Sequence, residues 1–154
     1  MTTQEISLKN LAYILATGLG VGYTPIAPGT AGSFVALCLF WVLPFSYSTW
    51  LIICLISLVI GIWSANIVER DKGKDPGLVV IDEFVGQWIT LLFLPKSIIL
   101  YITGFLLFRA FDIIKPFPAD KSQNIKGGLG VMIDDVIVGI YVNILLQLYV
   151  YFFQ

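Results

Sequence analysis

Long apolar runs dominate the hydrophobic pattern of this chain. Residues 49–68 read TWLIICLISLVIGIWSANIV and contain no charged side chain. Because about 20 apolar residues in helical form are needed to cross the hydrocarbon core of a bilayer, this segment predicts a transmembrane helix. Further apolar runs, separated by glycine, proline and polar breakers, predict other spans near residues 31–46, 79–94, 97–115 and 131–153.

The N-terminal part of the chain has a different pattern. Residues 5–18 are amphipathic and are predicted to lie along the membrane interface, and a loop rich in glycine and proline follows at 18–30. The first ten residues lack a basic leader with a small-residue cleavage site, so we expect no cleaved signal peptide. The pattern as a whole predicts an all-α, polytopic helical bundle of about five spans, forming one domain over residues 1–154.

Composition agrees with a membrane protein and excludes several functions. The chain is 58% hydrophobic and 12% charged, with a mean hydropathy of +0.90, which lies outside the range of soluble domains. A net charge of −1 disfavours a nucleic-acid partner. The absence of histidine removes the usual zinc ligand and the usual general base. Cys38 and Cys54 lie in apolar runs and are expected to be structural.

Basic residues predict the orientation of the bundle. Short loops rich in lysine and arginine stay on the cytoplasmic side of a membrane. With five spans and a cytoplasmic N-terminus, only Lys96 faces outward, and the C-terminal end lies outside the cytoplasm. The cytoplasmic side then receives seven basic residues, namely Lys9, Arg70, Lys72, Lys74, Lys115, Lys121 and Lys126.

The same orientation gathers the charges of the spans at one membrane face. A charged side chain in the middle of a membrane helix costs about 2.5–3.5 kcal/mol on insertion scales, so such residues are usually paired or functional. We therefore expect a polar site at the cytoplasmic ends of three spans. Its members are Asp82 and Glu83 in the third span, Arg109, Asp112 and Lys115 in the fourth, and Asp134 and Asp135 in the fifth.

The two acidic pairs predict a metal site. Four carboxylates brought together repel one another unless a cation lies between them, and oxygen ligands without nitrogen or sulfur suit magnesium. Asp82, Glu83, Asp134 and Asp135 are therefore the predicted magnesium ligands. Neutralisation by nearby bases and by helix N-termini is the alternative interpretation.

The segment FRAFDIIKPFP places Arg109, Asp112 and Lys115 at intervals of three on one helix face. One interpretation is a ladder of salt bridges. The other is a phosphate clamp, in which arginine supplies a planar fork of donors and lysine a point charge. Both interpretations remain open at this stage.

Small residues near the charged segments predict close packing and a loop that binds an anion. Gly86 and Gly139 follow the two acidic pairs and would let neighbouring helices approach closely. In the loop PIAPGTAGS, Thr30 or Ser33 is expected to cap the next helix and to help bind the substrate, with backbone N–H groups directed at an anion. The loop is not a Walker loop, because the Gly-Lys-Ser/Thr ending is missing.

Four stretches together resemble the phosphatidylglycerophosphatase A family: GYTPIAPGTAGS, DPGLVVIDEFVG, FRAFDIIKPFP and GGLGVMIDDVIVG, within about residues 17–140. The resemblance implies a multi-pass enzyme of the bacterial cytoplasmic membrane with its active site facing the cytoplasm. That enzyme would use magnesium to hydrolyse the phosphomonoester of the phospholipid phosphatidylglycerophosphate. The matching catalytic or binding residues are Asp82, Glu83, Arg109, Asp112, Lys115, Asp134 and Asp135.

The chain departs from some members of that family at RDKGKDPG, where they carry a histidine that therefore is not essential here. Attack by water and a covalent aspartyl-phosphate, formed on Asp82, Asp112, Asp134 or Asp135, both remain open. Another phospholipid substrate, or a phosphotransferase reaction, is an alternative function. A small ion- or proton-coupled transporter is disfavoured, because transport sites lie near the bilayer midplane. Headgroup selectivity, the number of metal ions and the oligomeric state stay open.

Overall fold

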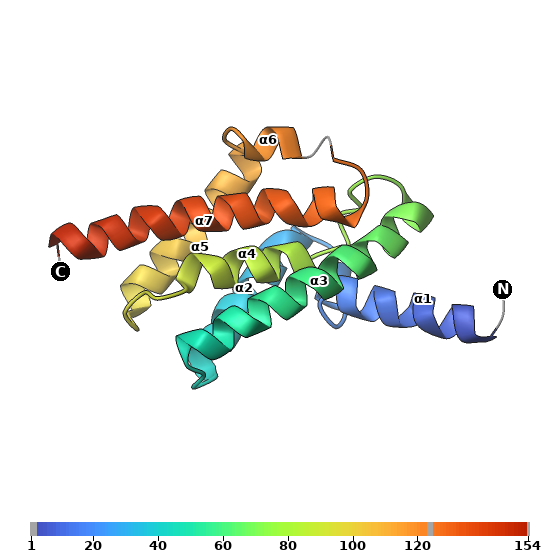
Figure 1. Ribbon diagram of the computed structural model, residues 1–154, viewed down its shortest axis with the longest axis horizontal. Coiled ribbons are helices and arrows are strands. Elements are labelled where there is room, and N and C mark those ends of the chain that lie inside the picture. The colour runs from blue at the N-terminus through green and yellow to red at the C-terminus, as the bar shows by residue number, and fades with distance from the viewer. Residues whose placement is uncertain (1–2, 123–124, 154) are drawn as a thin grey trace.

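The computed structural model describes residues 3–122 and 125–153, which form helices and no strands (Figure 1). The all-α prediction is confirmed. A short 3₁₀ turn, η1, covers Val21–Tyr23. The α-helices are α1 (Thr3–Ala16), α2 (Pro28–Val42), α3 (Tyr47–Lys72), α4 (Ile81–Leu91), α5 (Ile98–Ile114), α6 (Ala119–Ser122) and α7 (Gly128–Phe153).

Two helices are long and apolar enough to cross a membrane. Helices α3 and α7 have 26 residues each, and α2 is a shorter apolar helix of 15 residues. At 1.5 Å per residue, 26 residues extend about 39 Å, which exceeds the hydrocarbon core of about 30 Å. The structure thus supports a membrane protein, while the five crossings and the interfacial position of α1 stay predictions.

Helix α4 is shorter than its prediction, because the expected span at 79–94 is a helix of only 11 residues. It extends about 16 Å, roughly half of the hydrocarbon core. Side chains of α7 donate hydrogen bonds to the carbonyl groups at the C-terminal end of α4. The Asn143 amide donates to the backbone oxygens of Thr90 (3.1 Å) and Leu92 (2.8 Å), and the Gln147 amide donates to Leu92 (3.2 Å). These side chains satisfy acceptors that a helix end leaves open inside an apolar bundle.

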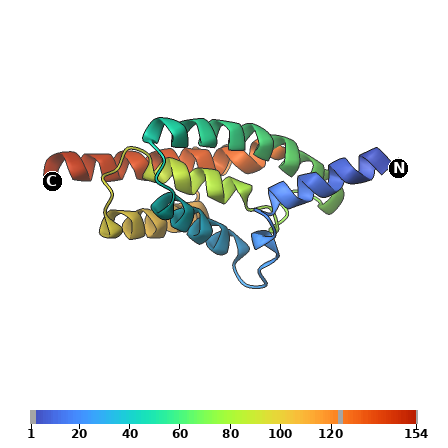
Figure 2. The same cartoon turned by 90° about the horizontal axis from the view of Figure 1, so that it is seen from below.

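Helix α4 lies inside the bundle and packs against α2, α3, α5 and α7 (Figures 1 and 2). Its aromatic side chains belong to the main core. The Trp88 indole is 5.3 Å from the Trp50 ring and donates a hydrogen bond of 3.0 Å to the backbone oxygen of Ala36 on α2. The Phe84 ring meets Trp88 edge-on at 5.6 Å. A buried indole that finds an acceptor fixes the orientation of α4 against α2.

Two glycines allow a close approach between α4 and α7. A Cβ atom added to Gly86 would lie 2.6 Å from the Phe108 ring and 2.8 Å from the backbone oxygen of Asp135. A Cβ atom added to Gly139 would lie 3.2 Å from the Gly86 Cα. The close packing predicted from these glycines is confirmed, and it brings the acidic segment of α7 beside the acidic start of α4.

The N-terminal helix α1 packs against the C-terminal end of α3 and extends away from the bundle (Figure 1). The Lys9 ammonium lies 2.7 Å from the Asp71 carboxylate, and the Tyr13 hydroxyl donates to the second oxygen of the same carboxylate. The backbone N–H of Val80 donates to the oxygen of Ala16 at 2.9 Å. These bonds attach α1 to the segment that leads into α4.

We predict that Gly86→Ala lowers the free energy of unfolding by about 1–3 kcal/mol, because the added methyl group must displace the Phe108 ring or the α7 backbone. Unfolding of the purified protein in detergent measures this loss. Gly77→Ala is the control, since a Cβ atom there meets nothing within 4 Å. Equal midpoints for the two variants would contradict the prediction.

Candidate active site

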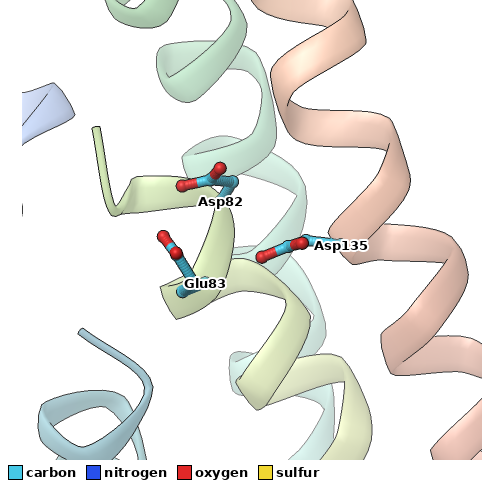
Figure 3. A group of neighbouring side chains, drawn as sticks. All are labelled: Asp82, Glu83 and Asp135. Atoms are coloured by element: carbon cyan, nitrogen blue, oxygen red, sulfur yellow. The ribbon is translucent and has the colours of Figure 1, made fainter. Parts of the chain in front are cut away.

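Three carboxylates converge where α4 begins beside α7. Asp82 and Glu83 lie in the first turn of α4, and Asp135 extends toward them from α7 (Figure 3). One oxygen atom of each lies within 4.8 Å of the other two. Asp82 and Asp135 are buried and Glu83 is half-buried. Both acids of the α4 pair thus belong to this group, with one acid of the α7 pair.

The unpartnered oxygens of this group fit a divalent cation. Within the part of the chain that the structure describes, Asp82 Oδ1, Glu83 Oε2 and Asp135 Oδ2 are buried and have no hydrogen-bond partner. Leaving such atoms without partners is costly, and like charges at this distance repel. An ion with a preference for oxygen would satisfy both requirements, and a donor set without nitrogen or sulfur fits magnesium.

The other acid of the α7 pair, Asp134, lies against Lys115. Asp134 forms an ion pair with Lys115, and its Oδ1 accepts a hydrogen bond of 3.1 Å from the backbone N–H of Asp135. Asp134 is not a member of the convergent group. Of the four predicted metal ligands, the structure therefore brings three together and places Asp134 against a base of α5.

Arg109 of α5 and Lys115, the residue that follows α5, are held in a series of ion pairs. Arg109 Nη1 lies 2.8 Å from Asp112 Oδ2 and 3.7 Å from Glu83 Oε1. Lys115 Nζ lies 3.6 Å from Asp112 Oδ1. The salt bridges of the first interpretation are thus present in the structure. Both bases also line the cavity that contains the three carboxylates. Arg109 Nε is buried without a partner, so the guanidinium keeps an unused donor.

The start of α2 completes the site in a way that differs from the expected cap. The residue before the helix is Ala27, Pro28 occupies the first turn, and no side chain caps the helix. The expectation that Thr30 or Ser33 caps α2 is therefore wrong. The Ser33 hydroxyl instead donates to the Gly29 oxygen at 2.9 Å and accepts from Arg109 at 3.3 Å. Thr30 is half-buried and does not belong to the cavity wall.

The cavity that joins these groups has a volume of about 290 Å³. Its wall also includes Asp75, an exposed residue of the loop between α3 and α4 that sequence analysis did not assign to the site. Asp75 has a left-handed backbone with φ of 48°, a conformation that aspartate tolerates better than most residues. The sequence DPG at 75–77 predicts a turn, but it does not predict the direction of the Asp75 side chain.

Gly29 leaves room for the acid and base at its side. A Cβ atom there would overlap the Glu83 carboxylate and would lie 3.1 Å from Arg109 Nη2. A larger residue at position 29 would therefore have to displace the Glu83 carboxylate. The backbone of α2, the carboxylate of α4 and the guanidinium of α5 meet at this point.

The fold and the site define a helical membrane-type protein with a cavity lined by acids and two bases, a setting suited to a metal ion and a phosphate group. The family model for phosphatidylglycerophosphatase A matches residues 14–150. The chain therefore belongs to the phosphatidylglycerophosphatase A family, a family of phosphatases, as its motifs predict.

Three relatives cover most of the chain. A putative phosphatidylinositol-3-phosphatase of Bacteroides thetaiotaomicron is 46% identical over 145 residues, which are 88% of this chain and 91% of the relative. Phosphatidylglycerophosphatase A of Escherichia coli K12 is 35% identical over 140 residues (88% and 81%). The enzyme of the same name from Haemophilus influenzae is 38% identical over 143 residues (90% and 88%). No solved structure matches the chain.

We predict that Gly29→Ala reduces phosphate release by about 100-fold, because displacement of Glu83 by about 1 Å disturbs the geometry of the reacting groups. The assay is release of inorganic phosphate from a lipid phosphomonoester by purified protein. Gly77→Ala is the matched control, since its methyl group borders the same cavity but meets nothing within 4 Å. Equal activity of the two variants would contradict the close contact at Gly29.

Proposed function

We propose that this protein hydrolyses the phosphomonoester of phosphatidylglycerophosphate to phosphatidylglycerol and inorganic phosphate, with magnesium, at the cytoplasmic face of the bacterial inner membrane. The observation that carries the proposal is the cavity in which three carboxylates with unpartnered oxygens face Arg109 and Lys115. The family supports the reaction and the lipid class.

The charges of the cavity suit a phosphomonoester. Such a group is dianionic near neutral pH, and its acyl chains keep it at the membrane surface. Arg109 offers a planar set of donors that matches two phosphate oxygens, and Lys115 adds a compact positive charge at the end of α5. Both bases would stabilise the charge that spreads over the equatorial oxygens during phosphoryl transfer.

The acids of the site have different roles in this proposal. Asp82, Glu83 and Asp135 would hold magnesium, which supplies charge neutralisation and activation of water when bound. Asp112 lies between the two bases and keeps them apart at a fixed distance through its ion pairs. Asp134 holds the Lys115 ammonium from the side of α7. Asp112 and Asp134 therefore position the groups that contact phosphate.

A second candidate substrate is phosphatidylinositol 3-phosphate. The Bacteroides relative that is 46% identical has a name of that type, as a putative activity. Both lipids present a phosphomonoester on a hydroxyl-bearing headgroup, so the catalytic groups above suit either. The difference between them lies outside the phosphate position.

The proposal is tested by phosphate release from phosphatidylglycerophosphate, phosphatidylinositol 3-phosphate and phosphatidic acid, with magnesium and with a chelator. We expect magnesium-dependent release with the highest kcat/KM for phosphatidylglycerophosphate. Asp135→Asn should reduce kcat by at least about 100-fold and weaken magnesium binding, whereas Asp134→Asn should cost about tenfold, because it acts through Lys115.

Thermal unfolding in detergent controls for loss of structure in both variants. The function fails if the parent protein leaves phosphatidylglycerophosphate intact. The metal assignment fails if Asp135→Asn binds magnesium and turns over like the parent.

The cytoplasmic orientation has its own test, which depends on whether the segment around α4 crosses the membrane. Seven basic residues on one side and one on the other predict that a reporter inserted in 69–77 is cytoplasmic and that a C-terminal fusion is external. If the short α4 and its flanking residues do not cross the membrane, the number of crossings between the 69–77 loop and the C-terminus falls by one. Both reporters would then lie on the same side, and the five-span prediction would be wrong.

A further inference from the structure

A second cavity of about 290 Å³ borders the active site. It lies between the end of α3, the loop that follows it and the start of α7. Its polar wall consists of Glu69, Lys74, Asp75 and Asp134. Asp75 belongs to the walls of both cavities, and Asp134 is paired with Lys115 of the active site. A ligand whose phosphate occupies the active site could therefore extend directly into the second cavity.

The second cavity suits hydroxyl groups better than a second phosphate or a metal ion. Its carboxylates outnumber its single ammonium group, so an anion would be repelled there. The carboxylates also do not gather around one point, since the convergent group found in the described part of the chain is Asp82, Glu83 and Asp135. Carboxylate oxygens accept hydrogen bonds from hydroxyl groups, and bonds that involve a charged partner are the stronger kind.

A third hollow, of about 380 Å³, continues from the second and has the opposite charge. It shares Glu69 and Lys74 with the second cavity and adds Arg70 and Lys126. Three basic residues against one acid make this hollow suitable for an anion. From the active site outward, the order is a phosphate site, an acidic cavity and a basic hollow.

We propose that the second cavity is the polyol subsite of the lipid headgroup, with Glu69 and Asp75 accepting hydrogen bonds from its hydroxyl groups, and that Lys74 and Lys126 bind the phosphodiester beyond it. The inference rests on the proposed function and extends it to the headgroup. The order of charges matches a polyol that carries a phosphomonoester on one side and a phosphodiester on the other. The polyol is glycerol in phosphatidylglycerophosphate and inositol in a phosphoinositide.

The test compares the KM of a complete headgroup with the inhibition constant of inorganic phosphate, which occupies the phosphomonoester position alone. Glu69→Gln keeps the size of the side chain and removes its charge, and Lys74→Met removes the ammonium. Each variant should raise the KM for phosphatidylglycerophosphate about tenfold and leave kcat and the inhibition constant of phosphate within about twofold. Asp120→Asn and Lys72→Met are the matched controls, because both residues are exposed and lie outside the three cavities.

Several results would contradict the proposed polyol subsite. It is wrong if Glu69→Gln weakens phosphate inhibition as much as substrate binding, if it changes neither constant, or if it alters the magnesium dependence. Should Glu69→Gln fail to fold, Lys74→Met decides by the same criteria.

The substrate panel separates this inference from the proposed function. If the parent hydrolyses phosphatidylinositol 3-phosphate instead, and Glu69→Gln raises that KM, the polyol subsite stands and the proposed function is wrong. If the parent hydrolyses only phosphatidic acid, which has no polyol between phosphate and diacylglycerol, both are wrong. If phosphatidylglycerophosphate is the substrate and both variants bind it like the parent, the subsite alone is wrong.

Discussion

The contact between Gly86 of α4 and Gly139 of α7 determines the geometry of the site. Helices inside a bilayer gain no hydrophobic free energy from their association, so close van der Waals packing between small residues holds them together. Asp82 precedes Gly86 by four residues, and Asp135 precedes Gly139 by four. Residues four apart lie on the same helix face, one turn from each other. The glycine contact therefore places one acid of each helix at the same level, one turn away from the crossing.

The ion pairs that compensate the buried charges of the site also connect its helices. Arg109, Asp112, Lys115 and Asp134 form a continuous series of ion pairs that joins α5 to α7. Removing one member of a buried pair leaves its partner without compensation, which destabilises a protein by about 3–5 kcal/mol in typical cases. The groups proposed to bind phosphate also connect helices. The activity of a variant at one of these positions must therefore be interpreted together with a measurement of its folding.

The apolar runs, the charged residues at the ends of three runs and the small residues Gly86 and Gly139 were sufficient to predict the helical class, the gathering of charges and close helix packing at the two glycines. That these two glycines meet each other was not predicted, because they lie on segments far apart in the chain. The short length of α4 could not be predicted in this way. The end of α4 is bonded by Asn143 and Gln147, which donate to the Thr90 and Leu92 oxygens from more than 50 positions away. The different directions of Asp134 and Asp135 depend in the same manner on Lys115, which no local pattern connects to them.

Helix α7 holds the middle and the end of α4, with the glycine contact at the centre of α4 and the Asn143 and Gln147 amides at its end. The position of the reacting groups is therefore set inside the bundle, where a change in sequence must preserve close packing. The proposed headgroup cavity lies against the start of α7 on one side, but its other walls are the last turn of α3 and the exposed loop with Lys74 and Asp75. Loops tolerate substitution better than packed helices. Relatives that share the helical site can thus differ in the headgroup that they accept, which agrees with the two kinds of lipid phosphatase named among the relatives of this chain.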